Sequence, residues 1–166
     1  MRWSKLKKVI EEGFAPSIAG RVTLLTTRYR HAHDQEGRWA LLIDGKEVGG
    51  MGCIVADREE RDLIQKARLE EGVSASSAQA KAMAVLAENG RHTLPMFNHS
   101  VFSFTQLSIN ESLDSADAVL KSLAYLDRRL GKRRLAILSA SPPKTLMERA
   151  CLSLRLNSER ISISWA

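Results

Sequence analysis

The chain has 166 residues, of which 44% are hydrophobic and 27% are charged, so it can bury one core and does not have the composition of a disordered chain. No apolar run approaches the roughly 20 residues that span a bilayer, and residues 1–13 lack the apolar segment of a secretory signal. The net charge of +6 raises the expectation of a polyanionic partner, although most of that charge lies within residues 2–8 and 126–135.

The first third of the chain predicts a short helix followed by a small antiparallel sheet. Apolar residues at helical spacing predict the helix over 4–12. Strands rich in β-branched and aliphatic residues are predicted over 21–30, 38–43 and 46–55. The pair Asp44-Gly45 separates the last two strands and predicts a type I′ hairpin, because both central residues of that turn need a positive φ.

The middle of the chain predicts helices. A charged helix over 57–71 precedes an alanine-rich helix over 74–90. Gly72 follows the first helix and Gly90 ends the second. Residues 94–107 fit a helix or an extended segment, and the spacing of their apolar residues favours the helix. Ser108 and Glu111 then have the spacing of a capping box.

The last third predicts two further helices and a terminal strand. A continuous apolar stripe predicts a helix over 115–130, with Gly131 as a left-handed residue that ends it. Residues 132–140 are expected to form a short strand or a turn, and Ser141 with Pro142 should begin the next helix. Alternating isoleucines and serines over 159–165 predict a half-buried strand.

Together these elements predict a single α+β domain over 1–166. Its antiparallel meander, within about 21–55, would pack against four to six helices. Cys53 and Cys151 are far apart and flanked by apolar residues, so we interpret them as reduced cysteines of a cytoplasmic protein.

The segment "HAHD" contains the most ligand-like residues of the sequence. His31 and His33 share one side of an extended backbone and Asp34 follows, which is a set of side chains suited to Zn²⁺. The remaining histidines, His92 and His99, would have to come close to complete a site. A metal-dependent hydrolase is therefore one hypothesis, and a solvated loop between two strands is the other.

Two other motifs point to structure rather than to chemistry. "GGMG" at 49–52 lies within a predicted strand, without the Gly-Lys-Ser/Thr of a phosphate-binding loop, so it indicates a bulge or a helix lying close to the sheet. "SPPK" at 141–144 has the spacing of a serine–lysine pair but lacks the companion motifs of such enzymes. We therefore expect no cofactor and no catalytic residue from either motif.

Basic residues form the candidate contacts for phosphates or nucleic acid. They are Lys5, Lys7, Lys8, Arg28, Arg30, Arg133 and Arg134. Arg28 and Arg30 would share one strand face, which is also what the solvent face of a half-buried sheet looks like. If residues 133–137 form a strand, one arginine lies on the core side and needs a carboxylate, such as Asp127, Glu111 or an acid of 57–71. A structural ion pair and a phosphate site both stay open here.

Four segments together resemble a family of small, uncharacterised bacterial proteins. They are "RWSKLKK" at 2–8, "TTRYRHAHDQEGR" at 26–38, "SLDSADAVLKSLAYLDRRLGKRRL" at 112–135 and "SLRLNSE" at 153–159. The most specific of these stretches is "LDRRLGKRRL" at 126–135. The resemblance implies a bacterial, cytoplasmic and self-contained domain, and it implies no activity.

The sequence thus favours a non-enzymatic cytoplasmic domain that binds another protein or a second copy of itself, through the sheet edge or the carboxyl-terminal strand. A nucleic-acid-binding protein that uses both basic segments is the first alternative. A metal-dependent hydrolase at His31 and His33 is the second. No membrane partner is expected.

Overall fold

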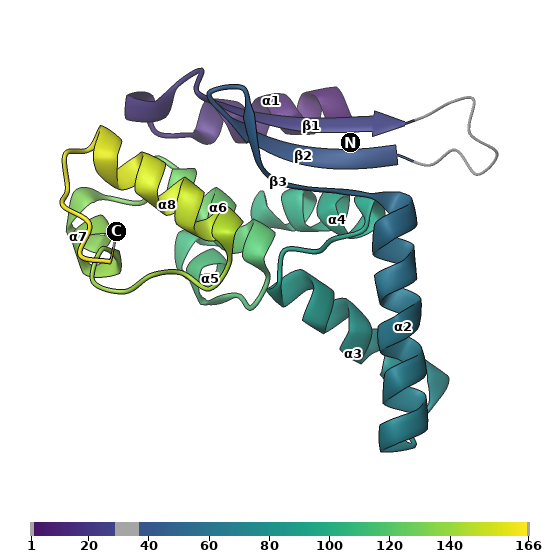
Figure 1. Cartoon of the computed structure of the whole chain (residues 1–166). Coiled ribbons are helices and arrows are strands. Elements are labelled where there is room, and N and C mark those ends of the chain that lie inside the picture. Colours follow the sequence, from purple (N-terminus) through teal and green to yellow (C-terminus); the bar gives the residue numbers. More distant parts are fainter. Residues whose placement is uncertain (1, 29–36, 166) are drawn as a thin grey trace.

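The computed structural model describes residues 2–28 and 37–165 and has the predicted α+β class (Figure 1). A three-stranded antiparallel sheet in the order β1-β2-β3 consists of β1 (Val22–Arg28), β2 (Gly37–Ile43) and β3 (Lys46–Gly52). The helices among the described residues are α1 (Trp3–Gly13), a short 3-10 turn η1 (Pro16–Ile18), α2 (Cys53–Glu71), α3 (Ala75–Glu88), α4 (Leu94–Phe104), α5 (Ile109–Asp114), α6 (Ala118–Leu126), α7 (Lys132–Leu138) and α8 (Leu146–Ser158).

The predicted hairpin is confirmed. Asp44 and Gly45 both have positive φ, 50° and 76°, and they join β2 to β3. Leu24 pairs with Leu41 and Trp39 pairs with Met51, so these four side chains share one face of the sheet. All four are buried, which fixes this face as the one that meets the core.

The core lies between that sheet face and α4, α6 and α8, which Figure 1 shows beneath the sheet. The fully buried Trp39 ring stacks on Phe97 of α4, with ring centroids 4.4 Å apart. Every residue of α6 except Lys121 is buried, so this helix is the centre of the helical layer. The described side chains of the sheet and of these helices therefore form one continuous core.

The glycines of "GGMG" lie where a helix approaches the sheet. β3 has a register shift opposite Leu41 and Leu42, as the interpretation of a bulge requires. A Cβ added to Gly49 would overlap the side chain of Met147 at the start of α8. The sequence interpretation of this motif is confirmed, because the strand needs the absence of a side chain here.

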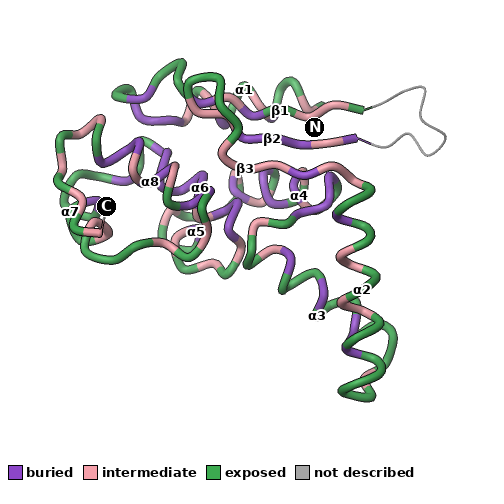
Figure 2. The backbone as a smooth tube through the Cα atoms, in the orientation of Figure 1, coloured by how far each residue is buried: buried purple, intermediate pink, exposed green. Residues whose placement is uncertain are grey.

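Helices α2 and α3, residues 53–88, form an arm that extends away from the rest of the described chain, which we call the body (Figure 1). Figure 2 shows that most of the arm is exposed, whereas buried residues gather in the body. The buried residues of the arm are Ala56, Ala67, Ala78, Ala82 and Leu86. The seam between the two helices is therefore narrow and consists mainly of alanine.

The predicted helix over 115–130 is wrong in its bounds. The structure has a shorter helix, α6, because the Asp117 carboxylate caps its first turn and the backbone turns extended again at Asp127. At that point the chain pairs with the end of α1: the Ala15 N–H donates to the Leu126 carbonyl at 2.9 Å and the Arg128 N–H donates to the Gly13 carbonyl at 3.0 Å. This long-range pairing ends the helix before its apolar stripe does.

Gly131 does not have the predicted left-handed conformation, since its φ is −77° and it is the residue that precedes α7. Residues 132–138 are helical rather than a strand or turn, and Arg133 consequently lies exposed and not on a core face. The two helices α5 and α7 are the reason that the structure has more helices than the four to six expected.

Two predictions near the carboxyl end are also wrong. The helix begins at Leu146 and not at Ser141, because Thr145 and Glu148 form a complete capping box there. Residues 160–165 form no strand; the Ser164 N–H and hydroxyl both bind the Ser139 carbonyl, at 3.3 and 2.5 Å, and hold the segment against α7. The described chain therefore offers no carboxyl-terminal strand for self-association.

Candidate functional site

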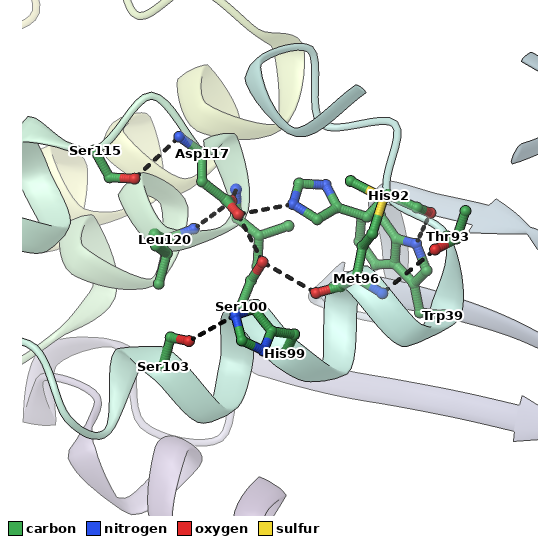
Figure 3. A network of polar contacts seen from close by, with 11 residues as sticks. Trp39, His92, Thr93, Met96, His99, Ser100, Ser103, Ser115, Asp117 and Leu120 are labelled. Atoms are coloured by element: carbon green, nitrogen blue, oxygen red, sulfur yellow. Dashed lines mark hydrogen bonds and ion pairs between the residues drawn. The ribbon is translucent and has the colours of Figure 1, made fainter. Parts of the chain in front are cut away.

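A buried polar network joins the start of α4 to the start of α6 (Figure 3). The Trp39 indole N–H donates to the His92 carbonyl at 2.7 Å, and the Thr93 hydroxyl accepts the Met96 N–H at 3.3 Å to cap α4. These two contacts hold the backbone carbonyl of His92 and the next residue, Thr93, in place. The imidazole, fully buried, is thereby turned toward Asp117.

Asp117 is the centre of this network. Its Oδ1 accepts the Val119 and Leu120 N–H groups at 2.8 and 3.0 Å and so caps α6. Its Oδ2 accepts the Ser100 hydroxyl at 2.6 Å and lies 3.0 Å from His92 Nε2, which must carry the hydrogen because an ionised carboxylate only accepts. The four acceptor positions of the carboxylate are all occupied.

The contacts of Asp117 also control its charge. Burial by itself would raise the pKa of this carboxyl, but the hydrogen bond and charge of His92, with the bonds from Ser100 and the Leu120 N–H, outweigh burial and hold the pKa below its usual value. The carboxylate is therefore ionised at neutral pH, although its side chain is only 16% exposed.

The relative positions of Ser100, His92 and Asp117 argue against nucleophilic catalysis by the serine. In a serine triad the imidazole lies between the serine and the carboxylate, so that it can take the hydroxyl proton. Here Ser100 and His92 both bind the same oxygen of Asp117, and the carboxylate lies between them. The arrangement positions α4 against α6 and does not activate the serine.

A hollow of about 640 Å³ opens beside this network, between the arm, α4 and the start of α6. Asp117 and Ser100 contribute to its polar part, and Met83 of α3 with Met96 of α4 contribute to its apolar walls. Asp57 and Glu60 line it from α2. A volume of this size is within the range of small-molecule sites, which makes the hollow the candidate functional site.

The ligand-like residues of the sequence lie elsewhere. His31, His33, Asp34 and Arg30 lie outside the described residues. His92 is engaged by Asp117, and His99 is exposed, with its Nε2 3.5 Å from the Ser103 hydroxyl. Within residues 2–28 and 37–165, no group of three or more histidine, cysteine, aspartate and glutamate side chains could hold a metal ion.

The candidate basic residues that the structure describes are exposed, except the half-buried Lys7, which pairs with Glu11 at 3.7 Å, and they fall into separate groups. Lys8 pairs with Glu12 on α1 at 3.7 Å, and Lys5 lies exposed on the same helix. Arg28, at the end of β1, borders a shallow hollow with Trp3 and Leu6. Figure 1 places the beginning of α1 and the helix α7 at different ends of the body.

The two candidate arginines of α7 form a group apart from the basic residues of α1. Arg133 and Arg134 are exposed at the start of the helix, and Arg134 donates to the Asn110 side-chain oxygen at 2.5 Å. The prediction that an arginine of 133–137 lies on the core side is wrong, because these residues form a helix on which Arg133 and Arg134 are exposed. An arginine that is buried is Arg155 of α8, paired with Glu159. Nucleic-acid binding by Arg133 and Arg134 stays a prediction.

A sequence model of the SF0329 protein family matches residues 2–156. The chain belongs to this family. The predicted resemblance to an uncharacterised family is thereby confirmed.

Neither the curated proteins nor the solved structures gave a match to the chain. In the described part of the chain, no helix combines the length and the apolar composition that crossing a membrane requires.

Sequence reasoning missed the residues of the hollow. Asp117 lies inside the predicted helix over 115–130, whereas the structure has it as the residue that caps α6. An aspartate directly before an apolar run is a capping signal that the sequence contains. Asp57 and Glu60 are three residues apart and so share a helix face, which the sequence shows. Whether this face meets α4 depends on the direction in which α2 leaves the sheet. No local sequence pattern specifies that direction.

Proposed function

We propose that the protein is a non-enzymatic, cytoplasmic interaction domain and that the arm is the surface through which it binds a partner protein. The observation that carries this proposal is the distribution of apolar side chains on the arm. The arm buries mainly alanines, while large apolar side chains are 40–76% exposed: Ile54, Val55, Leu69, Met83 and Val85. The arm therefore has apolar surface that a partner can cover.

The packing of the arm supports this proposal energetically. Burial of apolar surface stabilises the folded state by about 25 cal/mol per Å². A seam of alanines buries little side-chain surface and therefore contributes little. Helix pairs that are not supported by a larger core are marginal in water. A partner that covers Leu69 and its neighbours would add the burial that the arm lacks, and the arm would become ordered more firmly as it binds.

The charge of the arm favours a basic partner. Residues 53–88 contain five basic and seven acidic residues, whereas the rest of the chain contains twenty basic and twelve acidic residues. Opposite charge on two surfaces steers their association and excludes wrong partners. The body of a second copy has the required charge, so self-association is the first case to test.

Both cysteines are free, with Cys151 buried and Cys53 half-buried, which supports a reducing compartment. Ser100, His92 and Asp117 are arranged to hold two helices together, which supports a role other than catalysis. Both observations fit an intracellular binding protein.

The test compares two leucines of similar exposure. Leu69 near the tip of the arm is 76% exposed and Leu146 at the start of α8 is 79% exposed. Multi-angle light scattering over a range of protein concentrations should show self-association that Leu69→Asp abolishes and Leu146→Asp leaves intact. If the protein is monomeric throughout, affinity capture from a lysate of the source organism with the same two variants tests for a different partner. Capture that does not depend on Leu69, after negative scattering data, rules out the arm as the binding surface.

A further inference from the structure

The hollow at the base of the arm contains a combination of groups that the partner-binding surface does not need. Its walls come from α2, α3 and α4, and its volume is about 640 Å³. Met83, Pro95 and Met96 make the walls largely apolar. Concave sites with apolar walls and few polar groups are where proteins bind small organic molecules.

Carboxylates outnumber basic side chains among the described residues that line the hollow, where His99 is the one basic side chain. Three carboxylates line it, from Asp57, Glu60 and Asp117, and no lysine or arginine does. A pocket with low-dielectric walls and charges of one sign concentrates ions of the opposite sign. The hollow is therefore electrostatically suited to a cation.

Asp57 and Glu60 have no ion-pair partner among the described residues, and the same holds for Asp62 of the same helix. Glu59 is paired with Arg91, Glu71 with Lys81 and Glu88 with Lys144. The two carboxylates of α2 that line the hollow are thus without a protein cation among the described residues.

Asp117 contributes its charge and not a free acceptor. All four acceptor positions of its carboxylate are used by α6, Ser100 and His92, as Figure 3 shows. The same contacts keep its pKa below the usual value, so the inner end of the hollow stays negative at neutral pH. Direct contacts to a ligand cation have to come from Asp57 and Glu60 of α2.

We propose that this hollow binds a small organic amine, with its ammonium group at Asp57 and Glu60 and its apolar part against Met83, Pro95 and Met96. The apolar walls exclude a hydrated metal ion as the best occupant, because such an ion prefers several oxygen ligands in close geometry. The carboxylates exclude fatty acids and other anions. The proposal does not depend on what binds the arm.

The test uses three probes of similar shape that differ in charge: 2-phenylethylamine, 2-phenylethanol and 3-phenylpropanoate. Titration of ¹⁵N-labelled protein with the amine should give saturable shifts of amides in 57–60, 83–87 and 95–100. The alcohol should bind about tenfold more weakly, since it lacks the charge-assisted contacts, and the carboxylate should not bind. Hexylamine extends the test to an aliphatic amine.

Matched double variants separate the proposed contacts from the overall charge of the arm. Asp57→Asn with Glu60→Gln removes the two carboxylates that line the hollow and should weaken amine binding about tenfold. Asp62→Asn with Glu70→Gln removes the same charge from positions of α2 that do not line the hollow, and should leave the affinity within about twofold. Circular dichroism of each variant verifies that the helices are retained.

Three outcomes would overturn the proposal. One is the absence of saturable shifts in these segments with both amines at millimolar concentration. Another is an alcohol that binds as tightly as the amine, which would show an apolar groove without selectivity for cations. The third is an equal loss of affinity in the two double variants, which would assign the effect to the net charge of the arm. Each of these results leaves the partner-binding role of Leu69 unaffected, because that residue does not line the hollow.

Discussion

Arg155 and Glu159, one turn apart near the end of α8, form an ion pair that connects separate parts of the chain. Arg155 Nη1 donates to the Ser17 hydroxyl at 2.6 Å, and its Nη2 donates to the Leu130 carbonyl at 3.1 Å. Glu159 accepts the Ser17 hydroxyl at 2.7 Å and pairs with Lys132 of α7 at 3.2 Å. The pair therefore holds η1, the loop before α7 and α7 itself against α8.

Removing the guanidinium should be costly for stability. Arg155 is only 4% exposed, so Arg155→Met removes the buried ion-pair partner of Glu159 and leaves the Leu130 carbonyl without its guanidinium donor. We expect the free energy of unfolding to fall by about 3–5 kcal/mol in urea denaturation, the range for breaking a buried pair. The matched control is Arg133→Met, an exposed arginine that should change it by about 0.5 kcal/mol or less. Similar losses in both variants would contradict this assignment.

Asp117 predicts how stability responds to acid. Because the folded state lowers the pKa of this carboxyl, its contribution is complete above the unfolded pKa of about 3.9 and is lost as the pH falls through the lower folded pKa. Asp117→Asn should therefore reduce the acid-induced loss of stability below about pH 4, and should cost about 1–3 kcal/mol at neutral pH. Urea denaturation at several pH values measures both effects. The exposed Asp114→Asn is the control, and an equal change in its acid response would refute the prediction.

Gly49 and Met147 should be energetically coupled. A Cβ at position 49 would overlap the Met147 side chain, so Gly49→Ala should destabilise by about 1–3 kcal/mol, as overpacking does. In a Met147→Ala background the same substitution should cost less, because the overlapping sulfur is gone. A double-mutant cycle in urea gives the coupling energy. Additive losses would mean that the helix does not approach the strand as closely as the structure shows.

The two cysteines should differ in reactivity. Complete burial raises the pKa of the Cys151 thiol to about 12, whereas Cys53 at the start of α2 is half-buried. Labelling of the native protein with a thiol-specific disulfide reagent near pH 8 should modify Cys53 first, since the thiolate is the reacting form. In denaturant both thiols should react. Cys53→Ser should remove the fast native reaction, and a fast reaction that persists in this variant would show that Cys151 is accessible.

Local signals were sufficient for most of the fold. The positive φ of the Asp44-Gly45 turn, the capping box of Ser108 and Glu111, and the α+β class follow from patterns within a few residues. These signals work because the energy that decides them is local: a turn conformation or one capped N–H group.

The predictions of secondary structure were wrong where contacts with a distant segment override the local sequence pattern. The stripe over 115–130 is helical by its period, but the chain pairs with residues 13–15 from Leu126 onward, and backbone hydrogen bonds to a distant segment replace those of the helix. The isoleucines over 160–165 alternate as in a strand, yet no described strand lies beside them. Neither partner could be identified from the neighbouring sequence.

The candidate site was the least predictable part. Its carboxylates come from α2 and from the start of α6, about 60 residues apart in sequence, and ordinary acids at exposed helix positions gave no reason to select them. Arg155 was missed for a similar reason, since an arginine of α8 resembles a solvent-facing residue, like Arg149 of the same helix, until the segment that covers it is known.

The narrow seam of the arm has a consequence for how the family can vary. Of residues 53–88, only Ala56 is a buried member of the body's hydrophobic core, so the body does not depend on how far the arm extends. Adding or removing one helical turn from both α2 and α3 would move the tip by about 5.4 Å without repacking the sheet or α6. The length of the arm can therefore change among members of the family without changing the stability of the body.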